Sequence, residues 1–237
     1  MIMDLRQRLA RASGLLYLVI AVCGLCAPLA FGDTSDPVAA AADLERHHTV
    51  FAAGVVGWTV LVLADTAVAV TLYLLLRPVA PTLAAITAAL RLVYSAMLGA
   101  CLIHLGTAFS LRSDPSYRHG LDPAATDTFR AVALSAFDTG FRLALIVFGV
   151  HCLGLGMLFR RARYIPRLLA ALLLAAGIGY ITTSLLAVLA LAADGELTSL
   201  LLVPALVGEL GLTFWLLVKG VDGRAPSRAR VPTPAAE

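Results

Sequence analysis

The chain has 237 residues, of which 60% are hydrophobic and 14% are charged, and its formal net charge is +3 at pH 7. Soluble domains are about 45–50% apolar and about 25% charged. The composition therefore excludes an ordinary water-soluble protein and predicts a polytopic membrane protein. The sequence contains no phosphate-binding glycine loop and no zinc-protease pattern, so no cofactor is expected. Nothing supports a nucleic-acid role, because the basic residues fall where membrane orientation requires them.

Six apolar runs are each long enough to cross a hydrocarbon core, which needs about 20 helical residues. We predict an all-α protein, a bundle of six transmembrane helices. Residues 1–12 are expected to form a cytoplasmic amphipathic segment, 13–220 the transmembrane domain, and 221–237 a disordered cytoplasmic tail. The predicted spans are, in chain order, about 13–31, 51–76, 82–111, 128–159, 165–192 and 197–219.

The distribution of basic residues predicts the orientation of the chain. Twelve of the 18 Lys and Arg residues fall on one side of the six runs, four fall on the other side, and two lie inside the runs. Cytoplasmic loops carry the excess of Lys and Arg, so both termini are predicted to be cytoplasmic. Nine of the 15 acidic residues lie in the opposite loops: Asp33, Asp36, Asp43, Glu45, Asp114, Asp122, Asp127, Asp194 and Glu196. We therefore expect a multi-pass protein of the bacterial cytoplasmic (inner) membrane, surrounded by the lipid bilayer.

Ionisable side chains inside the apolar runs are the best sign of a functional site. Charge at membrane depth costs at least about 2.5–3.5 kcal/mol per residue, so such residues should face the bundle interior and pair with one another. Five are predicted to meet near the midplane, where they are candidates for binding a ligand or carrying a proton: Asp65, Arg91, Asp138, Arg142 and Glu209. The secondary candidates are polar or aromatic groups nearby: Trp58, Tyr94, His104, His151 and Tyr180.

The spacing of these charges predicts how they pair. Asp138 and Arg142 stand four positions apart on one helix face, where side chains touch. Arg91 then needs an anion, and Asp65 and Glu209 are both available. The five charges sum to −1 when all are ionised, so the odd carboxyl should be protonated, bind a cation or share a proton. The alternative interpretation is an ion-pair network that only fixes the helix register.

The sulfur and imidazole side chains are too scattered to predict a metal site. His104 shares a helix face with Met97 and Cys101, a set that copper accepts, but it is expected toward the outer side. His151 is expected toward the inner side, so both histidines are read as uncharged core residues. The CxxC motif at 23–26 lacks a second cysteine pair, which makes thiol–disulfide exchange a minor alternative.

Six short motifs, in their order and spacing, resemble a large bacterial membrane-protein family called domain of unknown function 4386 (DUF4386). They are the stretches at 14–18, 72–79, 148–156, 164–167, 202–210 and 215–220. The resemblance covers about residues 8–221 and implies a six-helix integral membrane protein. It carries no agreed activity and no catalytic residues, although His151 and Glu209 lie within two of the motifs.

Three functional hypotheses follow from the buried charges. The first is a protein that binds or transports a small or amphipathic molecule, with Arg91 or Arg142 anchoring an anionic group and Asp65 or Glu209 carrying a proton or cation. The second is a membrane-embedded enzyme that acts on a lipid or isoprenoid, with a carboxyl as general acid. The third is a non-catalytic helper that packs against a membrane partner. A transporter predicts water access from both sides, an enzyme predicts a lateral opening to lipid, and a helper predicts neither. A homodimer is compatible with the small size of the chain.

Overall fold

The computed structural model describes residues 2–29, 47–113, 116, 120–162, 164–191 and 195–221. Within these ranges the chain contains helices and turns and no strand. The helices are α1 (Ile2–Leu29), α3 (His48–Leu76), α4 (Pro81–Ser113), α5 (Pro123–Arg161), α6 (Arg167–Val188) and α7 (Gly195–Val218). All six are long and apolar enough to cross a membrane, which confirms the predicted all-α bundle of six spanning helices.

The helix bounds agree with most of the predicted spans to within a few residues, and the starts of two helices differ more. The first helix begins at Ile2, so the segment expected to be a separate amphipathic terminus continues directly into the first span. The fourth predicted span begins earlier, at Pro123, because the Asp122 carboxylate caps it by accepting a hydrogen bond from Ala125 N at 2.7 Å. The predicted cytoplasmic tail lies, apart from Val221, outside the described residues.

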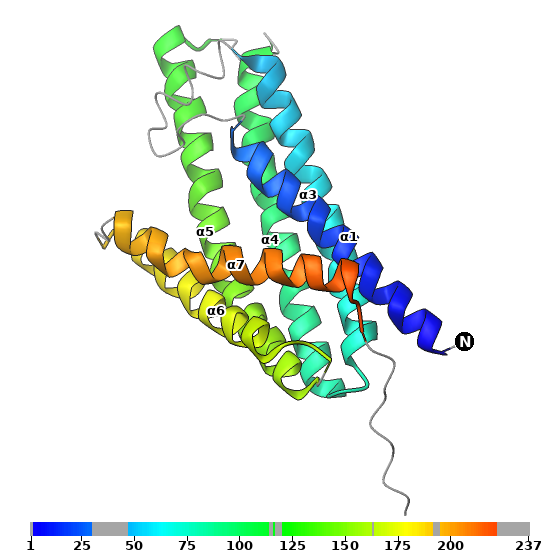
Figure 1. Cartoon of the computed structure of the whole chain (residues 1–237). Helices are drawn as coiled ribbons and strands as arrows, with labels where there is room; N and C mark the ends of the chain where they lie inside the picture. Colours follow the sequence, from blue (N-terminus) through cyan, green and yellow to red (C-terminus); the bar gives the residue numbers. More distant parts are fainter. Residues whose placement is uncertain are drawn as a thin grey trace, which may run out of the picture.

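Two neighbouring helices are longer than a membrane requires. Helix α5 has 39 residues and α4 has 33, whereas a hydrocarbon core about 30 Å thick needs about 20. At about 1.5 Å per residue, α5 is long enough to extend well past the core at one end. Figure 1 shows that α4 and α5 reach beyond α6 and α7 at the end farther from the chain's N-terminus. This difference in length decides which side chains lie at the midplane.

The six helices close a ring. Each helix packs against its neighbour in the chain, and α7 returns to pack against α1 (Figure 1). The α5–α6 contact depends on small residues, since a Cβ added at Gly149 would lie 2.7 Å from the carbonyl oxygen of Gly177. Small residues let helix backbones approach closely in membranes. Gly149 and Gly177 therefore mark the place where α5 and α6 cross.

Helix α1 crosses the C-terminal end of α7 at about the middle of its length. A Cβ added at Gly14 would lie 2.8 Å from Leu217 N, and the Gln7 side chain donates to the Lys219 carbonyl at 3.2 Å and accepts from Val221 N at 3.1 Å. Beyond this crossing α1 runs along α3 while α7 runs along α6, so the two helices diverge (Figure 1). The ring is consequently tight at one end of the α1–α7 pair and open at the other.

Candidate functional site

A buried ion pair between α3 and α4 lies at the centre of the bundle. Arg91 Nη2 lies 2.5 Å from Asp65 Oδ1, Arg91 Nε lies 3.1 Å from the same oxygen, and each side chain is 1% exposed. Ser95, one helical turn after Arg91, donates to Asp65 Oδ2 at 2.6 Å. Both carboxylate oxygens are therefore hydrogen-bonded. Of the two anions that the sequence offered to Arg91, the structure pairs it with Asp65.

The remaining donors of Arg91 bind two further helices. Nη1 donates to the Tyr17 hydroxyl on α1 at 2.7 Å and lies 3.2 Å from His151 Nε2 on α5. His151 Nδ1 lies 2.8 Å from the Thr87 carbonyl oxygen, which accepts only, so Nδ1 carries the proton and Nε2 accepts from Arg91. The guanidinium also lies over the rings of Tyr17 and Phe148, 4.8 Å and 5.4 Å from their centroids. One arginine thus joins α1, α3, α4 and α5.

The ion pair lies near the middle of the expected membrane. Depth is counted along each helix from the end that joins a short turn containing arginine, at 77–80 or 160–166, and for α7 from the end beside Lys219. By this count the four side chains lie about nine to twelve residues deep, or about 14–18 Å at 1.5 Å per residue: Asp65, Arg91, His151 and Glu209. Half of a 30 Å core is about 15 Å. The midplane depth of Asp65, Arg91 and Glu209 stays a prediction, and the structure adds that Asp65 bonds to Arg91 and lines one cavity with Glu209. The expectation that His151 lies nearer the inner side is wrong, because it contacts Arg91 in the same layer.

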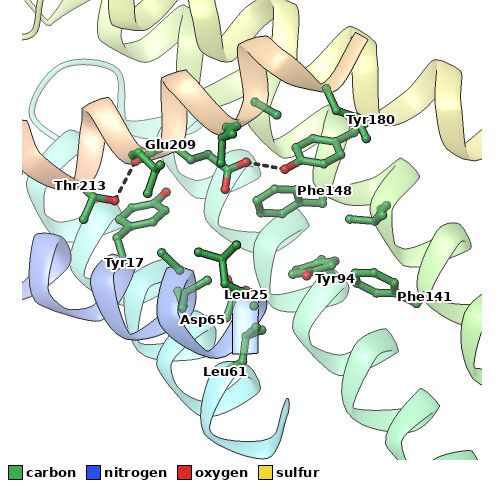
Figure 2. A pocket seen from close by; sticks show the side chains of 18 of the residues that line it. Tyr17, Leu25, Leu61, Asp65, Tyr94, Phe141, Phe148, Tyr180, Glu209 and Thr213 are labelled. Atoms are coloured by element: carbon green, nitrogen blue, oxygen red, sulfur yellow. Dashed lines mark hydrogen bonds between the residues drawn. The ribbon is translucent and has the colours of Figure 1, made fainter. Parts of the chain in front are cut away.

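Glu209 is in the same layer but has a different environment. Its carboxylate accepts a hydrogen bond from the Tyr180 hydroxyl on α6 at 2.8 Å, and Figure 2 shows this pair at the edge of a cavity. Within the described part of the chain, none of the ion pairs involves Glu209. An acid without a basic partner is unusual at membrane depth, where a lone charge is costly.

A cavity of about 390 Å³ lies inside the ring and is lined by side chains from all six helices. Most of its wall is aliphatic or aromatic, and two carboxyls, Asp65 and Glu209, reach it (Figure 2). No Lys, Arg or His is among the lining residues that the structure describes. The six aromatic side chains of the wall are Tyr17, Trp58, Tyr94, Phe141, Phe148 and Tyr180.

The cavity opens sideways, between α1 and α7. Leu25 on α1 and Leu206 on α7 both line it and are 61% and 56% exposed, so the cavity is not closed off at this edge. Leu25 follows Gly14 on α1 and Leu206 precedes Leu217 on α7, so both lie beyond the crossing of these helices. Figure 1 shows that the two helices diverge there. An opening between two membrane-spanning helices faces the hydrocarbon core of a bilayer.

The second predicted ion pair forms, but it lies elsewhere. Arg142 Nε is 2.7 Å from Asp138 Oδ2, as the four-residue spacing predicted. The side chains are 40% and 32% exposed, and neither lines the cavity. Counted from Arg161, the basic end of α5, they lie about 19–23 residues deep, or about 29–35 Å at 1.5 Å per residue, which places them at the far boundary of the core. The expected meeting of all five charges is therefore wrong, since α5 is longer than one membrane thickness.

The other secondary candidates divide in the same way. Trp58, Tyr94 and Tyr180 line the cavity, and Trp58 Nε1 is buried with no hydrogen-bond partner among the described residues. His104 is exposed near the end of α4 that extends past the core, far from the cavity. No group of three or more His, Cys, Asp or Glu in the described ranges is arranged to hold a metal. The four cysteines, the CxxC pair included, are free thiols.

Sequence reasoning missed three residues that complete the buried network. Ser95 lies four positions after Arg91, so its place on the same helix face was available as a signal. Thr87 lies four positions before Arg91 and offered the same signal, whereas Tyr17 gave none, because it reaches Arg91 from another helix, α1. The sequence did not predict the cavity either, because the cavity depends on the position at which α7 diverges from α1.

Comparison with known proteins identifies the family. A protein from Archaeoglobus fulgidus, described as uncharacterized, is 31% identical over 167 residues, which cover 70% of this chain and 83% of that protein. No solved structure matches the chain. The family model for the domain of unknown function DUF4386 matches residues 12–220. The chain therefore belongs to the DUF4386 family, as its motifs predicted, and is a member with six helices able to span a membrane.

Proposed function

We propose that this protein binds an amphipathic molecule in the central cavity and admits it from the membrane between α1 and α7. The carrying observation is that Leu25 and Leu206, on two diverging helices, both line the cavity and are both more than half exposed. Small-molecule sites are typically apolar concavities with a few polar groups that fix orientation. Here the apolar wall accommodates the tail, and Glu209 with Tyr180 provides the polar end.

The buried Asp65 and the half-buried Glu209 have different roles in this proposal. Asp65 is fully engaged by Arg91 and Ser95, so its network holds helices together and gives the cavity a rigid wall. Glu209 has one oxygen bound to Tyr180 and belongs to no ion pair of the described residues. It therefore has bonding capacity left for a ligand. The anchoring of an anionic group by Arg91 is not favoured, because its donors are occupied and it does not line the cavity.

Binding or transport is favoured over catalysis by the same geometry. A lateral opening also suits an enzyme that acts on lipids, but acid–base catalysis needs a positioned group that exchanges its proton. Asp65 is paired with Arg91. Among the described residues that line the cavity, this leaves Glu209 as the one carboxyl that could serve as such a group. A helper protein would need no cavity at all. We propose that the protein lies in the bacterial cytoplasmic membrane with both termini in the cytoplasm, because Lys and Arg residues are concentrated in the turns on that side.

Native mass spectrometry in mild detergent tests the proposal. The wild-type protein is expected to retain a small-molecule or lipid adduct, and Leu206→Trp, which fills the mouth, is expected to lose it. Val207→Trp is the matched control, because Val207 is the next residue on α7, is 50% exposed and does not line the cavity. Adducts that persist equally in both variants would contradict entry between α1 and α7. The mass of the intact complex also reports whether two copies associate.

A further inference from the structure

We infer that the ligand of this cavity is a lipophilic cation, an ammonium or similar positive group that carries apolar substituents. The inference rests on the proposed function and names the chemical class that the same site takes. Three features of the cavity wall carry it: the sign of its charges, its aromatic rings and its volume.

The charges of the buried layer balance either when Glu209 takes up a proton or when a cation lies beside it. Asp65 and Arg91 neutralise each other at 2.5 Å, and the hydrogen-bond pattern of His151 is that of a neutral imidazole. Glu209 is then left as an acid without a cationic partner among the described residues. A monovalent cation beside Glu209 would bring the layer to zero, and a buried charge is tolerated when it is paired.

Aromatic rings suit the same kind of ligand. Cations are attracted to the faces of Trp, Tyr and Phe, most strongly where water is excluded, and quaternary ammonium groups are recognised in this way. This protein already uses the interaction, because the Arg91 guanidinium lies over Tyr17 and Phe148 from outside the cavity. Trp58 and Tyr94 line the cavity as well, and Figure 2 shows Tyr94 and Phe148 on the same side of it.

The wall is unsuited to an anionic ligand. Among its described residues there is no Lys, Arg or His, whereas two carboxyl groups, Asp65 and Glu209, reach the space. An anionic headgroup would therefore be brought beside like charge in a low-dielectric interior, where repulsion is strong. A volume of about 390 Å³ falls in the range of pockets that hold drug-sized molecules, so a cation with several apolar substituents fits better than a bare ion.

Two probes of matched shape and opposite charge test the inference. Tetraphenylphosphonium and tetraphenylborate carry the same four phenyl groups around a positive and a negative centre. Binding to the full-length protein in lipid nanodiscs is measured by equilibrium dialysis, with empty nanodiscs subtracting partition into lipid. Saturable binding of tetraphenylphosphonium is expected, with tetraphenylborate bound at least tenfold more weakly. Glu209→Gln is expected to weaken phosphonium binding at least tenfold.

Glu196→Gln is the matched control, because Glu196 is an exposed acid in the first turn of α7 and does not line the cavity. It should leave phosphonium affinity unchanged. If Glu209→Gln does not fold, the comparison of the two probes on wild-type protein still decides the matter. Saturable borate binding equal to or tighter than phosphonium binding would overturn the cation while leaving the cavity as a binding site. Absence of saturable phosphonium binding overturns the inference, and if native mass spectrometry also finds no adduct, the proposed function fails with it.

Discussion

Replacing Arg91 with methionine should destabilise the protein far more than the same replacement at Arg142. Both arginines are paired with an aspartate, but the Asp65–Arg91 side chains are 1% exposed whereas Arg142 is 40% and Asp138 32% exposed. The comparison holds the chemical change constant and varies the burial. It therefore isolates the contribution of the buried network to the fold.

The magnitudes follow from the partners that each change leaves behind. Arg91→Met removes two hydrogen bonds to Asp65, one to Tyr17 and one to His151. It also leaves Asp65 with Ser95 as its partner in a buried site, and breaking a buried pair in this way costs about 3–5 kcal/mol. Arg142→Met removes one i,i+4 contact, and exposed pairs of this kind contribute about 0–1 kcal/mol. The expected difference in unfolding free energy is thus about 3 kcal/mol.

Reversible unfolding in mixed micelles, followed by circular dichroism, measures both free energies. The double variant Asp65→Asn with Arg91→Met should recover most of the loss, because it removes the uncompensated charge as well as its partner. Equal destabilisation by Arg91→Met and Arg142→Met would refute the reasoning. A double variant less stable than Arg91→Met alone would refute it too.

Two further predictions concern a helix crossing and a loop. Gly149→Ala should cost about 1–3 kcal/mol, because its Cβ would lie 2.7 Å from the Gly177 carbonyl oxygen, while Gly106→Ala, with no atom within 4 Å, should be neutral or stabilising in the same unfolding assay. Equal effects would show that the α5–α6 contact is loose. Burial raises the pKa of Tyr164, between α5 and α6, to about 12 against the opposing effect of Arg6. The contribution of Tyr164 to the free energy of unfolding is therefore complete below pH 10 and decreases as the pH rises toward 12. Between pH 9 and pH 11, Tyr164→Phe should lose less stability than the wild-type protein. Identical dependence of the unfolding free energy on pH in the two proteins would contradict this.

The architecture was predictable because it depends on properties that sum along the chain. Six long apolar runs, short proline-containing turns and basic residues at alternate ends fix the number of helices without any knowledge of contacts. Midplane residues were identified by the same means, since about ten residues from a basic end correspond to half of a hydrocarbon core. This is why Asp65, Arg91 and Glu209 were placed in one layer, where the structure has them.

The errors arose where a depth or a partner depends on tertiary structure. Asp138 and Arg142 were placed at the midplane because their span was counted from residue 128, whereas α5 extends from Pro123 to Arg161 and passes beyond the core. Arg91 on α4 pairs with Asp65 and not with Glu209 because α3, which carries Asp65, packs against α4. The sequence alone does not predict that packing, because Asp65 and Glu209 are both expected at the same depth as Arg91.

The cavity is the feature least accessible from sequence. It exists because α1 and α7 meet near Gly14 and Leu217 and then separate, with α1 following α3 and α7 following α6. Leu25 and Leu206 are ordinary residues of apolar helices until this divergence makes them the rim of an opening. The lateral opening in turn changes the function that the buried charges support, from anchoring an anion at Arg91 to binding an amphipathic molecule beside Glu209.

The most direct test of the central claim is the mass of what the wild-type protein retains when it is extracted gently from its membrane. The account predicts a stoichiometric adduct that carries apolar groups, that is absent from Leu206→Trp and that is present in Val207→Trp. Wild-type protein that carries no adduct under any mild extraction, while remaining folded, would contradict the claim that the cavity between α1 and α7 is a binding site.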